Sequence, residues 1–395
     1  MSNINSEKNY LTLVKEQNMS AILNKIWSRH PISRVELSDL TGLTSGTITN
    51  LTQQLLKKNI IQEFEPISNT VGRKRIMLGF NSKQFRIIGI DIGRTSFEIV
   101  ISNLIGEQIK SIEVDYRGFN GPEDILELIT PYIQNFINQI RNGGYQLLGM
   151  GVSIPGPMDK EEGVLKKAPN FPGWENYPVK KMLEEKFGVL TMIEDDARAA
   201  ALAERWFGIG KYGNDFIFIT IGMGIGSGVI SNGKLIRGSN GLYGQVGHMT
   251  VLSNGEQCEC GNFGCWETIC SIPPLLRSWN KNGSIDDLFK GIMNGDKQAQ
   301  KCIEEMLFYN EQAMVNIFNM YDIDQIVIGG RLFPYLSTYL HRIEKNVKER
   351  VFHFDKNIIK ILPSTFGASQ SAIGAVAIIF DELLNHPISL LTRPE

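Results

Sequence analysis

Cysteine is scarce in this sequence, with 5 among 395 residues, and three of them lie within eight positions, Cys258–Cys265. That crowding argues against a disulfide framework and is typical of a metal site, whereas Cys270 and Cys302 are interpreted as buried thiols. No apolar run approaches the ~18 residues of a membrane-spanning helix. The first ten residues lack the basic-then-apolar pattern of a signal peptide. We therefore expect a soluble, cytoplasmic protein with no membrane partner.

Net charge is also small, at −2, and by itself indicates no partner. Its distribution is uneven, because residues 1–80 carry ten Lys and Arg against six Asp and Glu, a surplus of four, which leaves −6 for the rest. A basic head on an acidic body fits a small nucleic-acid-binding module. The length predicts several domains. We expect a head over 1–82 and two α/β lobes over 83–205 and 206–395, with a C-terminal helix that could pack back on the first lobe.

The first eighty residues carry the pattern of a helix-turn-helix unit. Helices are predicted over Tyr10–Trp27 and over Ser45–Lys58. Between them, Ser33 and Glu36 have the spacing of a capping box for a short helix. Gly42 suits a tight turn that needs positive φ. The apolar residues expected on the buried faces are Leu11, Val14, Met19, Ile22, Leu23, Ile26, Leu37, Leu40, Leu43, Ile48, Leu51 and Leu55.

The exposed side of the last of these helices, with the segment after it, predicts contacts to DNA. Short polar side chains can reach base edges or phosphates without long flexible stems. Two predicted strands, Gln62–Glu65 and Ile76–Phe80, flank a polar turn with three consecutive cations, the pattern of a β-wing. The residues expected to contact DNA are Arg34, Ser45, Thr47, Thr49, Asn50, Gln53, Arg73, Lys74 and Arg75. The alternative is a three-helix packing module with a solvated basic run.

Beyond residue 81 the chain contains two related glycine-rich hairpins. At a constant offset of 129, seven of fourteen aligned positions in 90–103 and 219–232 are identical, which indicates two duplicated lobes. Glycine-rich tips let backbone N–H groups approach a phosphate, and Asp91 is suited to hold a metal or water beside it. The candidate nucleotide contacts, which could be vestigial, are Asp91, Gly93, Thr95, Gly222, Gly224 and Gly226. Plain tight turns are the alternative.

Two adjacent carboxylates stand where a strand passes into a helix. A buried strand is predicted over Thr191–Asp196, and an alanine-rich helix follows it. Asp196 therefore lies at a helix N-terminus, a usual place for a functional carboxylate. The alternative for Asp195 and Asp196 is N-capping with complementation of the helix dipole.

The most specific local motif in the chain is a candidate metal site made of His248, Cys258, Cys260 and Cys265. One imidazole and three thiolates make a closed tetrahedral set, as in a structural zinc site with no position left for water. Gly261 and Gly264 would let the loop fold tightly around the ion. A reactive cysteine cluster and an iron–sulfur site are the alternatives, and the lack of a fourth nearby cysteine argues against the second.

Together these segments resemble the ROK family of repressors, open reading frames and sugar kinases. The resemblance spans nearly the whole chain and rests on the motifs at 91–95, 222–228, 244–248, 258–267 and 326–330, with a head like that of the repressor branch, which includes xylose and N-acetylglucosamine repressors. It implies an α/β fold in which a winged helix-turn-helix precedes a two-lobed, actin-like (ribonuclease H-like) sugar-kinase body with a structural zinc loop.

The resemblance also implies a site and an effector. A monosaccharide is expected between the lobes, and the positions that match the family's sugar contacts are Asp195, Asp196, Gln245, His248 and Glu267. His248 would then serve both the zinc and the sugar. Asp196 matches the kinase general base, which takes the proton of the attacking hydroxyl.

Several departures weaken the kinase interpretation. Asp195 and Arg198 replace two asparagines that are usual in the kinases, and Gln245 replaces a glutamate. Arg94 and Ser96 replace a glycine and a lysine of the first phosphate loop. No catalytic residue is therefore assigned, Asp196 being a vestigial candidate, and ATP with Mg²⁺ is expected only if kinase activity is retained.

We therefore expect a repressor of carbohydrate-metabolism genes that binds double-stranded operator DNA, with a monosaccharide modulating its affinity and the chain forming a homodimer or a dimer of dimers. A sugar kinase, or a dual kinase and regulator, is the first alternative. The second is a zinc-stabilised regulator controlled by a partner protein, with a vestigial sugar cleft.

Overall fold

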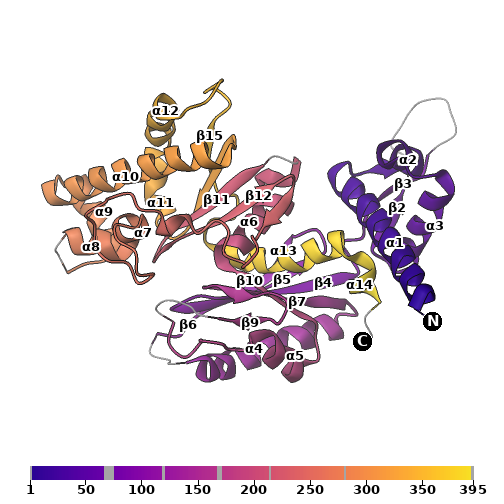
Figure 1. The fold of residues 1–395 in the computed structure, drawn as a ribbon. Helices are drawn as coiled ribbons and strands as arrows, with labels where there is room; N and C mark the ends of the chain where they lie inside the picture. The colour runs from indigo at the N-terminus through magenta and orange to yellow at the C-terminus, as the bar shows by residue number, and fades with distance from the viewer. Residues whose placement is uncertain are drawn as a thin grey trace.

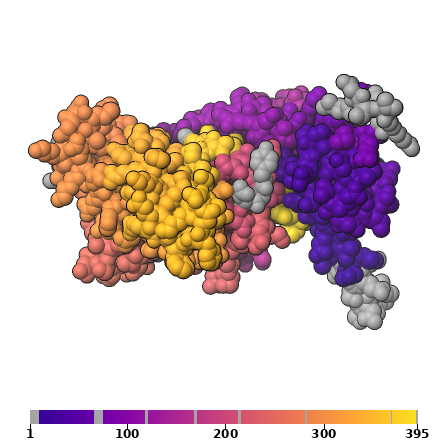
Figure 2. All heavy atoms as spheres, turned by 90° about the horizontal axis from the view of Figure 1, so that it is seen from above, coloured from indigo at the N-terminus to yellow at the C-terminus, as the bar shows by residue number. Residues whose placement is uncertain are grey.

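The computed structural model describes residues 2–65, 75–117, 121–166, 171–212, 215–279 and 282–392, without the side chains of 2–9 and 368. A small head formed by the N-terminal residues lies at one end of an elongated molecule, and two α/β lobes follow it (Figures 1 and 2). No helix in the described ranges is long and apolar enough to cross a membrane.

The head consists of three helices and a small sheet. Its elements are α1 (Ser2–Ser28), β1 (Ile32–Ser33), α2 (Arg34–Thr41), α3 (Ser45–Lys57), β2 (Ile61–Phe64) and β3 (Met77–Phe80), with strand order β1-β3-β2. The predicted capping box is present, because Ser33 accepts from the Glu36 backbone and Glu36 accepts from the Ser33 backbone N–H. Gly42 ends α2 with φ of 70°. The local signals thus set the helix boundaries.

Two of the residues predicted for the head core are exposed. Leu11 is 66% exposed, and among the side chains of α1 that the structure describes, from Tyr10 on, Met19 is the first buried one. Leu40 is 44% exposed. Leu43, just beyond the turn, packs against the core in its place. Both predictions were wrong because spacing within a helix does not reveal where the neighbouring helix ends.

The two lobes have sheets of identical topology. The first contains β4 (Phe85–Ile92), β5 (Ser96–Asn103), β6 (Gln108–Asp115), β7 (Gln146–Ile154) and β10 (Thr191–Asp195), in the order β10-β7-β4-β5-β6. The second contains β11 (Phe216–Ile221), β12 (Ile225–Ser231), β13 (Lys234–Ile236), β14 (Gln325–Gly329) and β15 (Lys360–Pro363), in the order β13-β12-β11-β14-β15. In each, an antiparallel hairpin is extended by parallel strands. This agrees with the duplication inferred from the 129-residue offset.

Helices cover the sheets and fill the space between the lobes (Figure 1). The first lobe carries α4 (Pro122–Asn142), α5 (Val179–Phe187) and the short hairpin β8 (Met158–Asp159) with β9 (Val164–Leu165). The second carries α7 (Glu267–Cys270), α8 (Ile272–Trp279), α9 (Ile285–Met293), α10 (Lys297–Tyr321), α11 (Phe333–Leu336) and α12 (Leu340–Arg350). The central pair is α6 (Asp196–Trp206) and α13 (Gln370–Asn385), and the short α14 (Pro387–Leu391) follows α13.

The central helices pack closely because the residues at their contacts are small. α6 packs on β12 of the second sheet, α13 packs on β4 and β7 of the first, and the two helices pack on each other. A Cβ on Gly374 would lie 2.3 Å from the backbone carbonyl carbon of Ala199. A Cβ on Gly151 would lie 1.8 Å from the carbonyl oxygen of Ala375. Only glycine allows such close approach of two backbones.

Candidate functional site

The four predicted metal ligands come together in the second lobe. The candidate ligand atoms of His248, Cys258, Cys260 and Cys265 all lie within 4.8 Å of one another. Sγ of Cys260 lies 3.7 Å from Sγ of Cys265, and Sγ of Cys258 lies 3.6 Å from Nδ1 of His248. A tetrahedron with Zn–S bonds of about 2.3 Å has edges of about 3.8 Å. The donor set and its spacing therefore fit a zinc ion.

The loop that carries the cysteines is shaped by two left-handed glycines. Gly261 has φ of 94° and Gly264 has φ of 61°. A Cβ on Gly264 would lie 1.7 Å from the carbonyl oxygen of Leu252, so no larger residue fits. Burial raises the pKa of the Cys258 thiol to about 12, so in the metal-free protein this group is a thiol. A bound cation would stabilise the thiolate and displace that proton.

Glu267 connects the cysteine cluster to the second glycine-rich hairpin. It begins α7 shortly after Cys265, and its Oε1 lies 3.5 Å from Nδ1 of His248 and 3.5 Å from Sγ of Cys258. Its Oε2 accepts a hydrogen bond of 3.3 Å from the backbone N–H of Ile225. Two of the residues predicted to contact the sugar, His248 and Glu267, are thus neighbours. Gln245 directly precedes the short 3-10 turn Val246–His248, and its side chain is exposed.

The aspartates of the first lobe lie at the carboxyl ends of its parallel strands. Asp91 is near the end of β4 and accepts a hydrogen bond of 2.8 Å from Ser153 of β7. Asp195 ends β10 and caps α6, accepting from the backbone N–H of Arg198. Asp196 accepts from the backbone N–H of Ala197 at 2.7 Å. The capping role that the sequence left open for Asp195 is therefore filled, and the three carboxylates still share one edge of the sheet.

Burial and mutual repulsion disfavour ionisation of these carboxyls. Burial, with the charge of Asp196 second, raises the pKa of Asp91 to about 7 and that of Asp195 to about 7. Burial also raises the pKa of Asp196. The second hairpin lies close by, since a Cβ on Gly226 would lie 2.9 Å from Cβ of Ala197. The first turn of α6 therefore sits between the acidic edge of one lobe and the glycine-rich turn of the other.

Sequence reasoning missed a buried guanidinium cluster behind Asp195. Arg198 is 2% exposed, and its Nε lies 3.8 Å from carboxylate oxygens of both Glu194 and Asp195. Glu194 also accepts a hydrogen bond of 2.8 Å from Nε of Arg237, which follows β13. The available signal was a glutamate inside an otherwise buried strand, because a buried charge requires a partner. Arg198, noted only as a departure from the kinases, is one of those partners.

An arginine of the second lobe, which sequence reasoning also missed, reaches the tip of the first hairpin, where three of the nucleotide candidates lie. Arg331 follows β14 in the second lobe and donates to the hydroxyls of Thr95 at 3.3 Å and Ser96 at 3.2 Å in the first. Within the tips, the N–H of Gly93 donates to Ser96 and that of Gly222 to Gly224. These backbone donors are thus engaged inside their own turns.

The predicted DNA contacts fall into three groups. Ser45, Thr49, Asn50 and Gln53 are exposed along α3, Thr47 is half-buried, and Arg75 is exposed just before β3. Arg34 instead donates to Thr52 at 3.1 Å and Glu63 at 2.8 Å, tying α2 to α3 and β2. Arg73 and Lys74 lie outside the described residues. The exposed polar row on α3 is the part that faces away from the head core.

These features define a bilobal protein of sugar-kinase architecture with an added helical head. The ROK family model matches residues 87–382, so the chain belongs to the ROK family, and the predicted fold class is confirmed. The xylose repressor of Bacillus spizizenii is 33% identical over 377 residues, 95% of this chain and 97% of that protein. The Escherichia coli DNA-binding transcriptional dual regulator NagC is 29% identical, covering 94% of each chain.

Solved structures of ROK proteins have the same fold as this chain. A ROK family transcriptional regulator, a homologue of E. coli MLC, superposes with a TM-score of 0.83 at 24% identity, covering 96% of this chain and 100% of that one. The ROK hexokinase of Thermus thermophilus superposes with a TM-score of 0.64 at 25% identity, over 75% of this chain and 99% of the hexokinase. Over its full length the chain is thus homologous to ROK transcriptional repressors, whereas the kinase fold corresponds to three quarters of it.

Proposed function

We propose that this protein is a cytoplasmic transcription repressor of carbohydrate-metabolism genes, whose affinity for operator DNA is changed by a monosaccharide bound between the lobes. The observation that carries the proposal is full-length homology to repressors that have a head as well as a ROK body. The proposal divides the chain into a head over 1–82 and lobes over 83–205 and 206–395, with a structural zinc at His248, Cys258, Cys260 and Cys265. It assigns the DNA contacts to the head, with α3 in the major groove and the wing beside it.

The cleft supports a sugar ligand through its chemistry. Carboxylates accept hydrogen bonds from the hydroxyls that surround a pyranose ring, and Asp195, Asp196 and Glu267 supply them from both lobes. Glu267 is held against both His248 and the Ile225 backbone, so zinc binding would fix one wall of the pocket. Because two of the relatives are named for xylose and N-acetylglucosamine, these are the first sugars to test.

The second candidate function is a sugar kinase, and one observation favours it. The pKa of Asp196 is raised by burial, which makes its carboxylate a stronger proton acceptor than that of an ordinary aspartate. Against it stand Ser96 in place of the usual lysine and the contacts of Arg331 with Thr95 and Ser96, which occupy the first phosphate turn. We therefore treat Asp91, Gly93, Thr95, Gly222, Gly224 and Gly226 as a vestigial nucleotide site.

The test is a DNA-binding titration with a duplex from the promoter region of the protein's own gene, with and without D-xylose, N-acetylglucosamine and D-glucose. A sugar-specific change in affinity supports the proposal, and Gln53→Ala on the exposed face of α3 should weaken DNA binding without changing sugar binding. DNA binding that no sugar alters would contradict the effector assignment. ATP consumption with a sugar, abolished by Asp196→Asn, would instead support the kinase.

The functional unit in this proposal is a symmetric dimer or a dimer of dimers. Helix-turn-helix dimers read two half-sites about 34 Å apart, one turn of DNA. A sugar lowers operator affinity only if it binds better to an arrangement of lobes that spoils this spacing.

A further inference from the structure

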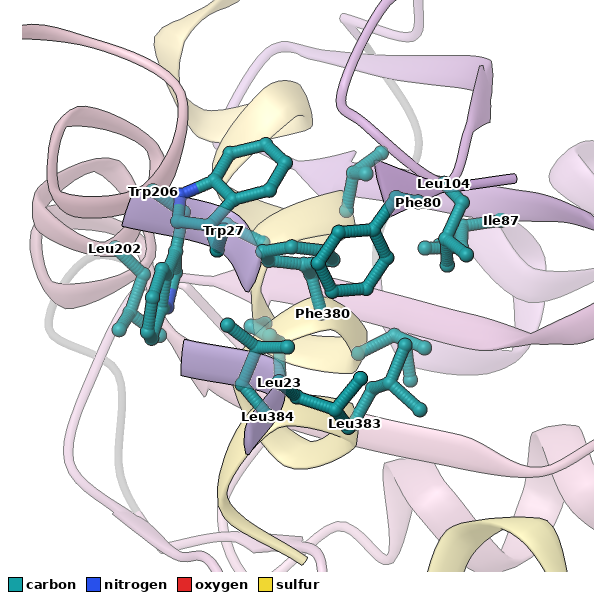
Figure 3. Packing of buried hydrophobic residues seen from close by; sticks show 14 of the residues in the cluster. Leu23, Trp27, Phe80, Ile87, Leu104, Leu202, Trp206, Phe380, Leu383 and Leu384 are labelled. Atoms are coloured by element: carbon teal, nitrogen blue, oxygen red, sulfur yellow. The ribbon is translucent and has the colours of Figure 1, made fainter. Parts of the chain in front are cut away.

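We infer that α6 and α13 form one rigid connection that transmits the occupancy of the cleft to the DNA-binding head, with Trp27 as the joint. This inference rests on the proposed function. α6 begins at Asp196, one of the proposed sugar contacts, and α13 begins where it is bonded to both lobes. Toward their other ends, the head packs on both helices through a continuous apolar core (Figure 3).

The joint is an aromatic cluster. The ring of Trp27, in the last turn of α1, has its centroid 4.7 Å from that of Phe380 on α13 and 6.0 Å from that of Phe207, which ends α6. Phe80 of β3 lies 5.6 Å from Trp27 and 5.8 Å from Phe380. Trp27 is 7% exposed. Trp27 of the head therefore contacts both central helices, and Phe80 adds a second aromatic contact to α13.

Polar contacts fix the head on the C-terminal helices as well. Asn24 of α1 donates to the carbonyl of Leu384 at 3.3 Å, and Lys58 donates to the carbonyl of Leu391 at 2.8 Å. In the opposite direction, Glu16 accepts from the backbone N–H of Ile388 at 3.1 Å. These bonds join the two ends of the chain, so the orientation of the head follows that of α13 and α14.

At their other ends both helices lie between the two lobes. α6 begins with Asp196 itself. Just before α13, Ser369 donates to Glu98 of β5 at 2.9 Å, and Gln370 accepts from the backbone N–H of Gly330 in the second lobe at 3.2 Å. The N-terminus of α13 is therefore held by both lobes, and a change in the angle between them must shift it.

The two central helices are packed too closely to move independently of each other. With 16 residues, α13 spans about 24 Å at 1.5 Å per residue. It is backbone-close to α6 at Gly374 and to β7 at Gly151, where a Cβ would overlap the neighbouring backbone. Trp206 of α6 donates to the carboxylate of Asp381 on α13 at 3.0 Å. Close-packed elements move as units rather than deforming locally, so displacement at the cleft end reaches the head.

The experiment measures hydrogen exchange of the full-length protein with and without the promoter duplex, so that it requires no known sugar. The measured quantity is the exchange rate of the backbone amides in the first turns of α6 and α13, residues 196–199 and 370–373. We expect DNA binding at the head to change their exchange rates by at least about fivefold, the lower end of ordinary coupling factors. Trp27→Phe should abolish this change while DNA affinity, which depends on α3, stays within about threefold of wild type.

Trp174→Phe is the matched control, because Trp174 is also buried with an unpartnered indole N–H but stacks on Phe171 within the first lobe. It should retain the response at the cleft ends. If Trp27→Phe fails to fold, as judged by thermal unfolding, Phe380→Leu tests the same joint from the α13 side. Where a sugar alters DNA affinity, Trp27→Phe and Phe380→Leu should bring the ratio of the DNA dissociation constants with and without sugar close to one.

The outcomes separate this inference from the proposed function. A wild-type protein that binds no promoter DNA removes the proposed function and this inference with it. DNA binding that leaves the amides at 196–199 and 370–373 unchanged overturns the inference alone. So does an identical response in Trp27→Phe and Trp174→Phe, since it would mean that the signal bypasses the joint.

Discussion

Oε1 of Glu267 lies 3.5 Å from Nδ1 of His248, so a residue proposed to contact the sugar touches a residue of the metal set. The same carboxylate holds the backbone of Ile225 in the second hairpin. Metal binding by the His248 and cysteine cluster and the shape of the proposed sugar site would therefore be linked through one side chain, and loss of the metal should change the structure beyond the cysteine loop.

Replacement of a cysteine ligand tests that link. Cys260→Ser should lose the zinc and the sugar response together, because three ligands hold zinc far less tightly than four. Elemental analysis measures the metal, which should fall from about one equivalent per chain to near zero, and the DNA titration measures the response. Cys302→Ser, in a buried cysteine of α10 outside the cluster, should keep both. A Cys260→Ser protein with normal zinc content would show that the ligand set is wrong.

The basic wing is tested by the salt dependence of DNA binding. Arg75 is exposed just before β3, and Arg75→Ala should weaken binding and reduce the slope of log K against log salt by about 0.9 for each phosphate that the variant no longer neutralises. Lys290→Ala, an exposed cation on α9 in the second lobe, should leave the slope unchanged. An unaltered slope in Arg75→Ala would remove this residue from the DNA interface.

The acidic edge predicts how stability depends on pH. Burial raises the pKa of Asp195 to about 7, so between about pH 4 and pH 7 the folded protein holds a proton that the unfolded carboxyl has released. The contribution of this group to stability therefore falls as pH rises through that window and levels off above it.

Asp195→Asn should remove this dependence while still capping α6, because asparagine is an equally good N-cap. In urea denaturation the variant should be more stable than wild type at pH 8 and close to wild type at pH 4. Greater stability of the wild type at pH 8 would mean that Asp195 is stabilised as an anion.

The contact between the central helices predicts a steric effect on stability. Gly374→Ala places a Cβ 2.3 Å from the backbone of Ala199, so we expect a loss of about 1–3 kcal/mol in the free energy of unfolding. Gly46→Ala is the matched control, because its Cβ would have no atom within 4 Å and alanine is the better helix former by about 0.8–1 kcal/mol. The two variants should move the urea midpoint in opposite directions. A Gly374→Ala protein as stable as wild type would show that the helices separate easily.

Local chemistry was read directly from the sequence. The capping box of Ser33 and Glu36 and the left-handed Gly42 depend only on neighbouring residues, and each is present. The 129-residue offset predicted two lobes because duplicated segments keep both their pattern and their fold. The histidine and cysteine cluster was identified because few residue types bind zinc and their spacing is short.

The contacts between segments that are distant in the sequence were decided by the tertiary structure. Four observations depend on where another part of the chain lies. They are the exposure of Leu11 and Leu40, the ion-pair partners of Arg198, the hydrogen bonds of Arg331 to the first lobe and the packing of Trp27 on α13. Periodicity gives the direction a side chain faces along its own helix or strand, but contact requires the position of a second element. The sequence by itself therefore indicated the family, the local elements and the cluster of candidate metal ligands, and the tertiary structure alone decided how the head packs on the central helices.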